Sequence, residues 1–206
     1  MRVVLLASGS GTLTQSVLDA FPAGHPAVTV AAVGSDRADA PVLDRARDAG
    51  VASFHVPPAA FSDRAAWDAA LAAAVAEYSP DWVVSAGFMR ILGSAFLDRF
   101  GGRTLNAHPA LLPAFPGAHA VRDALAHGVK VTGTTLHLVD AGVDTGPVVG
   151  QFPVAVRDDD TEASLHDRIR AVERKRLPEL LAHLAGHRLV VSGRRVSGWE
   201  PRHDTP

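Results

Sequence analysis

The sequence predicts an α/β fold: an open, doubly wound and mostly parallel sheet with helices on both faces and an antiparallel strand pair near the carboxy-terminal half. Two observations indicate this class. Short valine-rich runs alternate with alanine-rich amphipathic segments through the first half of the chain, which is the pattern of βαβ units. Two longer apolar runs, at residues 131–139 and 148–154, then follow each other across one loop, which favours a strand pair.

The strands are expected where β-branched residues form short runs that end at glycine, proline or polar turn residues. The expected strands cover residues 3–7, 28–33, 51–56, 81–86, 103–107, 131–139, 148–154, 189–191 and 194–196. The last two are expected to form a hairpin around Ser192 and Gly193.

The helices are expected where apolar residues recur at helical spacing between a cap and a stop signal. The expected helices lie between residues 12 and 21, 41 and 50, 62 and 78, 94 and 99, 119 and 127, and 161 and 184. Thr12, Ser62 and Thr161 are the expected N-caps, and Pro178 is expected to kink the last helix.

Length and composition favour one domain, residues 1–206, with a loose tail from about residue 198. The chain has 206 residues, of which 47% are hydrophobic and 20% charged, as in ordinary globular proteins. A formal net charge of −2 shows no basic excess, so no nucleic-acid partner is expected. The absence of cysteine excludes disulfides, thiolate metal sites and cysteine nucleophiles.

The first apolar run covers only residues 3–7, which is shorter than the core of a signal peptide. No segment of the sequence approaches the length of a membrane span. We therefore expect a cytoplasmic protein without a membrane partner.

Three polar or glycine-rich turns each follow a predicted strand, at Gly9, at Gly87 and at the segment that holds Asn106 and His108. Ligands of open parallel sheets bind at the carboxyl ends of the strands. We expect these three segments to open on the same edge of the sheet.

Residues 9–12 (GSGT) lie between a predicted strand and a predicted helix, so several backbone N–H groups would meet at a helix N-terminus and bind a phosphate monoester. A dinucleotide fingerprint is the alternative, with Asp36 available for a ribose. Thr14 stands where the third glycine of that fingerprint belongs. A tight turn without a ligand is the third interpretation.

Asn106 and His108 are expected to point to the same side of an extended segment, because Pro109 disfavours a helical conformation at the residue before it. An amide beside an imidazole could stabilise an oxyanion, although a histidine before proline can also be structural. Asp144 lies in a loop bounded by glycine and threonine, where it could form an Asx turn. If that loop folds over His108, we expect the carboxylate to raise the His108 pKa.

Other polar residues permit two interpretations each. Residues 88–92 (FMRIL) could line a pocket for a flat heteroaromatic ligand or pack into the core. Arg64 lies in the first turn of a helix, where the macrodipole disfavours a cation, so its charge could have another use. Glu173 lies among basic residues, which is typical of a solvated charged face.

Four histidines, His108, His119, His127 and His137, raise the question of a metal site. Their spacing matches no zinc signature, and no thiolate completes a ligand set, so no metal is expected. His137 lies near the end of a predicted strand and could face either the core or the cleft.

Three segments together resemble the phosphoribosylglycinamide formyltransferase family, the folate-dependent enzymes of purine biosynthesis. The segments are residues 106–117 (NAHPALLPAFPG), 133–137 (GTTLH) and 143–147 (VDTGP). The resemblance extends from Val3 to about Leu184. Residues 115–117 and the Gly9 loop separate the chain from methionyl-tRNA formyltransferases, which also carry an additional carboxy-terminal domain.

The resemblance implies transfer of a formyl group from the cosubstrate 10-formyltetrahydrofolate to the glycinamide amine of 5-phosphoribosylglycinamide, without a metal. It also suggests a homodimer. The implied catalytic residues are Asn106, His108 and Asp144. The implied phosphate-binding residues are Gly11, Thr12 and Leu13, and the remaining substrate contacts are Arg170, Ala171, Val172 and Glu173. The implied folate-binding residues are Arg64, Met89, Arg90, Ile91, Leu92, Asn106 and Val143.

Leu13 departs from the family pattern, because the common phosphate loop has asparagine at this position. Its backbone donor remains, but a side-chain contact is lost. Three other functions stay open. A 10-formyltetrahydrofolate hydrolase would use the same three catalytic residues with water as acceptor, although that family usually carries an amino-terminal regulatory domain and needs no phosphate loop. A nicotinamide oxidoreductase and an inactive folate- or nucleotide-binding module are the others.

Overall fold

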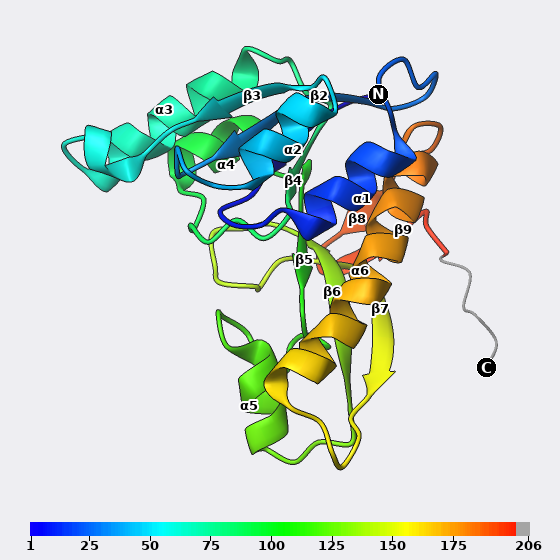
Figure 1. The fold of residues 1–206 in the computed structure, drawn as a ribbon. Coiled ribbons are helices and arrows are strands. Elements are labelled where there is room, and N and C mark those ends of the chain that lie inside the picture. The colour runs from blue at the N-terminus through cyan, green and yellow to red at the C-terminus, as the bar shows by residue number, and fades with distance from the viewer. Residues whose placement is uncertain (201–206) are drawn as a thin grey trace.

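The computed structural model describes residues 1–200, in which nine strands form one mixed sheet (Figure 1). The strands are β1 (Arg2–Leu6), β2 (Thr29–Ser35), β3 (Ala52–His55), β4 (Trp82–Ser85), β5 (Thr104–His108), β6 (Val131–Leu138), β7 (Val148–Ala155), β8 (Val190–Ser192) and β9 (Arg195–Ser197). Their order in the sheet is β3-β2-β1-β4-β5-β6-β7-β9-β8.

Strands β3 to β5 in this order are parallel, and chain order reverses between β1 and β4. Strand β6 then runs antiparallel to both β5 and β7, and β8 and β9 form an antiparallel hairpin. The doubly wound, mostly parallel sheet with an antiparallel pair is therefore confirmed.

Six α-helices flank the sheet, and a short 3₁₀ turn (η1, Pro58–Ala60) precedes the third of them. The helices are α1 (Thr12–Ala20), α2 (Val42–Asp48), α3 (Arg64–Ala76), α4 (Ser94–Phe100), α5 (Ala120–Ala126) and α6 (Glu162–Leu184). In Figure 1, α3 lies at one end of the molecule, and α5 lies at the other beside the ends of β6 and β7. Helix α6 continues through Pro178 to Leu184.

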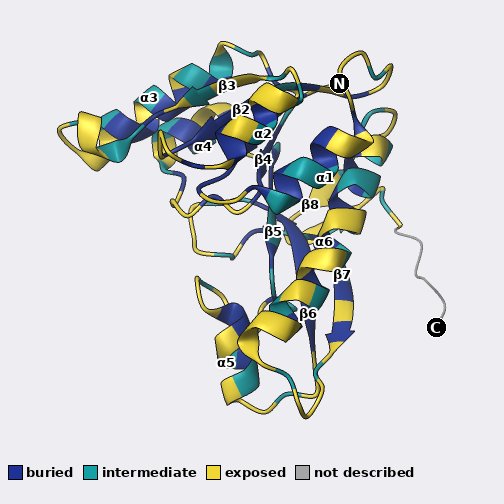
Figure 2. Cartoon of the chain, viewed as in Figure 1, coloured by how far each residue is buried: buried dark blue, intermediate teal, exposed yellow. Residues whose placement is uncertain are grey.

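Two hydrophobic clusters cover opposite faces of the sheet, as the alternation of side chains in β1 illustrates. Val3 and Leu5 pack in a cluster with α1, α2 and the second half of α6, whereas Val4 and Leu6 pack in a cluster with α3 and α4. All four side chains are fully buried. A strand covered on both faces explains why its sequence is continuously apolar. Figure 2 shows the same arrangement, with exposed residues mainly on the outer faces of the helices.

The structure confirms one predicted helix cap and corrects two. Thr161 caps α6 in a capping box with Ser164. The N-cap of α1 is Gly11, not Thr12, with a left-handed φ of 69°. A Cβ at Gly11 would lie 2.3 Å from a Val42 methyl carbon, so close packing of the loop requires glycine.

Helix α3 begins one residue later than predicted, because Asp63 and not Ser62 is its N-cap. The Asp63 carboxylate accepts a hydrogen bond of 2.8 Å from the Ala66 N–H. Strand β5 also extends one residue beyond its predicted end, so both Asn106 and His108 lie within the strand.

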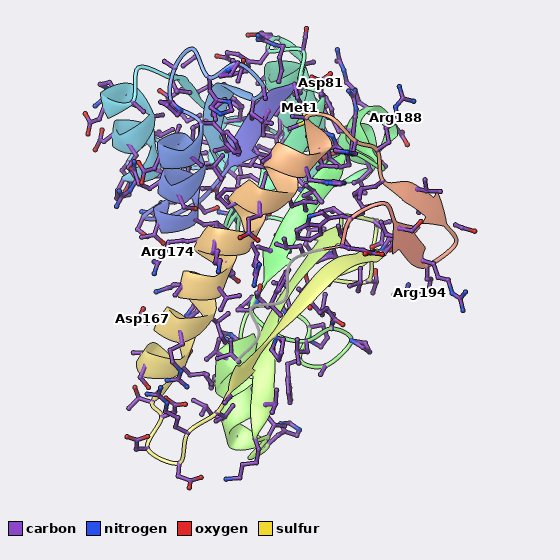
Figure 3. The ribbon with its side chains drawn as sticks, turned by 90° about the vertical axis from the view of Figure 1, so that its right-hand side faces the viewer. Met1, Asp81, Asp167, Arg174, Arg188 and Arg194 are labelled. Atoms are coloured by element: carbon purple, nitrogen blue, oxygen red, sulfur yellow. The ribbon has the colours of Figure 1, made fainter. Side chains whose placement is uncertain are left out.

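The predicted loose tail lies partly outside the described residues, at positions 201–206. Residues before that point contact the folded chain. The carbonyl of Gly198 accepts a hydrogen bond from His183, and the Trp199 ring lies 6.0 Å from the Phe152 ring. Figure 3 labels Arg194 on the β8–β9 hairpin, at the right-hand side of the view.

The corrected α3 cap gives a paired test. Asp63→Ala is expected to lower the free energy of unfolding by about 1 kcal/mol, because the Ala66 N–H loses its acceptor. Ser62→Ala is the matched control and is expected to change it by less than about 0.5 kcal/mol. Urea unfolding followed by circular dichroism measures both, and equal effects of the two substitutions would contradict the assignment.

Candidate active site

A cavity of about 840 Å³ opens where the chain order of the sheet reverses, at the carboxyl ends of the central strands. Its lining includes residues 8–13 after β1, residues 85–92 at the end of β4 and residues 106–109 at the end of β5. The loop between β6 and β7 and one face of α6 complete it. The expectation that the three turns open on one sheet edge is confirmed, and such crevices commonly bind ligands.

Asn106, His108 and Asp144 converge on this cavity. The Asp144 carboxylate lies 3.2 Å from His108 Nδ1 through one oxygen and 3.5 Å from Asn106 Nδ2 through the other. The Gly117 N–H donates to the same carboxylate at 2.8 Å. Asp144 therefore points into the cleft and forms no Asx turn. Asp140 has that role in this loop, since it accepts from the Gly142 N–H and the Thr145 hydroxyl.

His108 is buried between two acceptors. Its Nε2–H donates to the Phe115 carbonyl at 2.8 Å, and its Nδ1 faces Asp144. The doubly protonated ring would satisfy both partners, but burial disfavours that charge. Burial lowers the His108 pKa below its ordinary value, and this outweighs the upward effects of Asp144 and of the Phe115 hydrogen bond. The predicted upward effect of Asp144 is therefore confirmed, but burial makes the net change of the pKa downward.

The Asp144 carboxyl remains an acid of low pKa although it is partly buried. Burial alone would raise its pKa, but the neighbouring His137 ring, the hydrogen bond from the Gly117 N–H and the charge that His108 can carry lower it below the usual value. The site therefore holds a carboxylate ready to stabilise an imidazolium once His108 gains a proton.

His137 faces the cleft, which resolves the alternatives left by the sequence. Its Nδ1–H donates to the Leu138 carbonyl at 2.9 Å, so in the neutral ring Nε2 accepts from the Asn106 amide at 3.1 Å. This contact orients the Asn106 NH₂ group. Within the described residues, the other N–H of the Asn106 amide makes only the long contact to Asp144, which a ligand could replace.

The segment of residues 133–137 (GTTLH), on β6, supports the site through packing and hydrogen bonds. Gly133 lies so close to the Phe152 carbonyl that a Cβ would clash, which fits glycine at this position. The Thr135 hydroxyl donates to the Ala110 carbonyl and accepts from the Leu112 N–H, so it anchors the loop after His108. Sequence reasoning noted this segment only through the family resemblance.

Residues 9–12, which we call the glycine loop, present backbone donors to the cavity. Gly11 caps α1 without any side-chain hydrogen bond, so side chains do not occupy the first N–H groups of the helix. The Leu13 side chain packs into a hydrophobic cluster with Val17 and Leu177. Arg45 fixes the loop by donating to the Ser10 carbonyl at 2.6 Å. Leu13 therefore contributes only its backbone to any bound anion.

Residues 87–92 form one wall of the cavity, which we call the wall segment. Phe88 and Leu92 are buried, and the Phe88 ring stacks on Trp67. Met89 and Ile91 are 69% and 54% exposed and line the cavity, together with exposed Val143 from the β6–β7 loop. Large apolar side chains left exposed around a cavity are typical of a ligand site.

Three residues implied to bind ligands do not line the cavity. The Arg64 guanidinium lies over the Trp67 ring at 4.9 Å and donates to the Ile91 carbonyl, so it supports the wall segment from outside. On α6, Ala171 is exposed and Val172 packs against hydrophobic clusters, whereas Arg170 and Glu173 line the cavity. Figure 3 labels Arg174, a further lining residue, on the same helix.

Glu173 is buried, so its interpretation as part of a solvated charged face is wrong. Its carboxyl oxygen lies 3.1 Å from the Thr134 hydroxyl, which also lies 3.1 Å from the His108 carbonyl. One hydroxyl proton can satisfy only one acceptor, so a protonated Glu173 fits this geometry best. Burial raises its pKa to about 7. The spacing of Leu165, Ile169, Glu173 and Leu177 placed it in an apolar stripe and could have revealed its burial.

Within residues 1–200 no helix is long and apolar enough to cross a membrane. The same residues contain no group of three or more histidine and acidic side chains that could hold a metal ion. His119 and His127 flank α5 as its N-cap and C-cap, apart from the pair of histidines at Asp144.

The fold and the site together define a one-carbon transferase whose cleft lies where the chain order of the sheet reverses. The chain belongs to the formyl transferase family, whose pattern it matches over residues 1–181. It is 57% identical over 196 residues to phosphoribosylglycinamide formyltransferase of Mycobacterium tuberculosis, covering 95% of this chain and 90% of that protein. The Escherichia coli enzyme of the same name is 42% identical over 92% of this chain and 89% of its own length.

Among solved structures, glycinamide ribonucleotide transformylase 1 from Symbiobacterium toebii superposes with a TM-score of 0.91 at 48% identity. The match covers 97% of this chain and 94% of that one. The fold, including its antiparallel half, is therefore that of these transformylases.

Glu173 gives a pH-dependent prediction for stability. Its pKa is raised on folding, so between about pH 4.5 and pH 7 the folded chain binds more protons than the unfolded chain, and stability falls as pH rises. Glu173→Gln removes this loss. Relative to wild type, the variant is expected to gain about 2 kcal/mol between about pH 5.5 and pH 8.

Urea unfolding at the two pH values measures this gain, with Glu162→Gln, at an exposed position of the same helix, as the control. A gain that is the same at both pH values would show that the Glu173 carboxyl does not titrate in this window.

Proposed function

We propose that this chain transfers the formyl group of 10-formyltetrahydrofolate to the amine of 5-phosphoribosylglycinamide, as its named relatives imply. The observation that carries the proposal is the convergence of Asn106, His108 and Asp144 in one cavity, between an apolar wall and a glycine loop. A cavity of about 840 Å³ is within the usual range for sites of small-molecule ligands.

The two ligands are assigned to opposite parts of the cavity. Gly11, Thr12 and Leu13 bind the substrate phosphate through backbone N–H groups at the start of α1. Of the α6 segment implied by the resemblance, Arg170 and Glu173 make the contacts to the phosphoribosyl part, because these two line the cavity.

The folate occupies the apolar side, against Met89, Arg90, Ile91, Leu92 and Val143. Arg64 serves this site by holding the Ile91 carbonyl. No metal takes part, and the reduced folate acts as a cosubstrate.

The reaction begins when the neutral amine attacks the formyl carbon, which forms a C–N bond and places a negative charge on the formyl oxygen. The Asn106 amide and protonated His108 stabilise this oxyanion. The tetrahedral intermediate then collapses, the bond from the formyl carbon to the folate nitrogen breaks, and a proton moves to that nitrogen while the amine loses one. Asp144 stabilises the imidazolium form of His108 during this step and relays the proton.

The proposal includes three further features. The chain forms a single formyltransferase domain, and the single sheet that extends through residues 2–197 supports this. The enzyme works in the cytoplasm and as a homodimer, for which the support is the family resemblance. Light scattering coupled to size-exclusion chromatography tests the dimer.

Absorbance of the folate product tests the function directly. The purified protein is mixed with 10-formyltetrahydrofolate, with and without phosphoribosylglycinamide. Turnover is expected only with the amine acceptor. Turnover without it would indicate a hydrolase, and no turnover in either mixture by folded protein would indicate a binding module.

Removal of either charged member of the catalytic group is expected to abolish most activity. Asp144→Asn and His108→Ala should each lower kcat by about 10²- to 10³-fold. The second removes a donor to the oxyanion, and the first removes the charge that stabilises the protonated form of that donor. Asp158→Asn is the control, since Asp158 forms an exposed ion pair with Lys130 away from the cavity. Near wild-type kcat in either site variant would exclude this catalytic assignment.

A further inference from the structure

The wall segment, residues 87–92, lies outside helices and strands, so side-chain contacts must set its shape. Two hydrogen bonds join it to Ser8 after β1: the Ser8 N–H donates to the Gly87 carbonyl, and the Met89 N–H donates to the Ser8 hydroxyl at 2.8 Å. The Arg64 contact to the Ile91 carbonyl holds its other end.

A fourth contact holds the middle of the wall segment. Arg90 Nε donates to a carboxylate oxygen of Asp36 at 2.7 Å. Asp36 follows the end of β2, directly beside the strand that leads into the glycine loop. The contact therefore joins two cavity-lining residues that are 54 positions apart in the chain.

Asp36 differs from the exposed acids of the chain. Its side chain is only 2% exposed, whereas that of Asp39, which pairs with Arg37 nearby, is 75% exposed. The second carboxylate oxygen of Asp36 is buried without a hydrogen-bond partner in the described residues. A buried carboxylate is strongly destabilising without a charged partner, so Asp36 depends on Arg90 far more than a surface acid depends on its cation.

The dependence works in both directions, because the pair also fixes Arg90. Met89 and Ile91 flank Arg90 and expose their apolar side chains to the cavity. An Arg90 released from Asp36 would let both neighbours shift. The Asp36–Arg90 pair thus sets the position of the apolar wall.

We propose that Asp36 is a positioning residue for the reduced-folate cosubstrate: it acts through Arg90, touches no substrate, and holds Met89 and Ile91 where a flat ring can pack on them. This inference rests on the proposed function. It predicts that loss of the Asp36 charge weakens folate binding selectively and spares the phosphate side of the cavity.

Asp36→Asn tests this, because asparagine keeps the shape and one acceptor oxygen but removes the charge. The KM for 10-formyltetrahydrofolate is expected to rise about 10-fold, with kcat changed by less than about 3-fold and the KM for the phosphorylated acceptor by less than about 2-fold. Asp39→Asn is the matched control and should leave all three values unchanged. Arg90→Gln combined with Asp36→Asn should show little effect beyond that of Arg90→Gln alone.

Binding of 5-formyltetrahydrofolate, which cannot donate its formyl group in this reaction, separates failure of this inference from failure of the proposed function. Wild-type protein should bind it, and Asp36→Asn should bind it about 10-fold more weakly. If wild type neither binds it nor turns over 10-formyltetrahydrofolate with the amine acceptor, the proposed function fails, and this inference fails with it. If wild type binds it but Asp36→Asn has unchanged affinity, or loses affinity for both substrates equally, the positioning role alone is wrong.

Discussion

The Asp144 carboxylate is the group on which the site depends. Four residues from three separate segments surround it: His108 and Asn106 on β5, His137 on β6, and Gly117, through its N–H, in the loop after Pro109. Its own backbone has a φ of 53°, a left-handed conformation that costs free energy for a residue with a side chain. These contacts hold the strained loop in place, so the geometry of the site and the path of the loop are set together.

The fold makes that convergence possible because the sheet changes direction beside the site. Parallel strands β1, β4 and β5 bring their carboxyl ends to one edge, and antiparallel β6 then returns along β5, so that His137 lies directly opposite Asn106. If the sheet were wholly parallel, a crossover connection would separate β5 from the next strand, and the residue opposite Asn106 would come from the far end of that connection. The antiparallel half thus supplies the residues that orient the donors contributed by the parallel half.

Much of this could be predicted from the sequence, since runs of β-branched residues and helical spacing mark buried strands and amphipathic helices wherever local and tertiary preferences agree. Contacts between residues far apart in the sequence could not be predicted in this way. No local pattern links Asp36 to Arg90. Glu173 looked solvated because its sequence neighbours are basic, although its place in the apolar stripe of α6 could have revealed its burial. For His108, the sequence indicated the sign of the Asp144 effect, but the extent of burial, which decides the net pKa, comes only from packing.

The central claim is that burial lowers the His108 pKa in the free protein and that His108 becomes an imidazolium beside Asp144 when the substrates bind. Nitrogen-15 NMR titration of the His108 ring tests it most directly, in the free protein and in the complex with 5-formyltetrahydrofolate and phosphoribosylglycinamide. The account predicts a His108 pKa below the ordinary value in the free protein and a clear increase in the complex. A pKa that is already above the ordinary value in the free protein, or that does not rise in the complex, would contradict it.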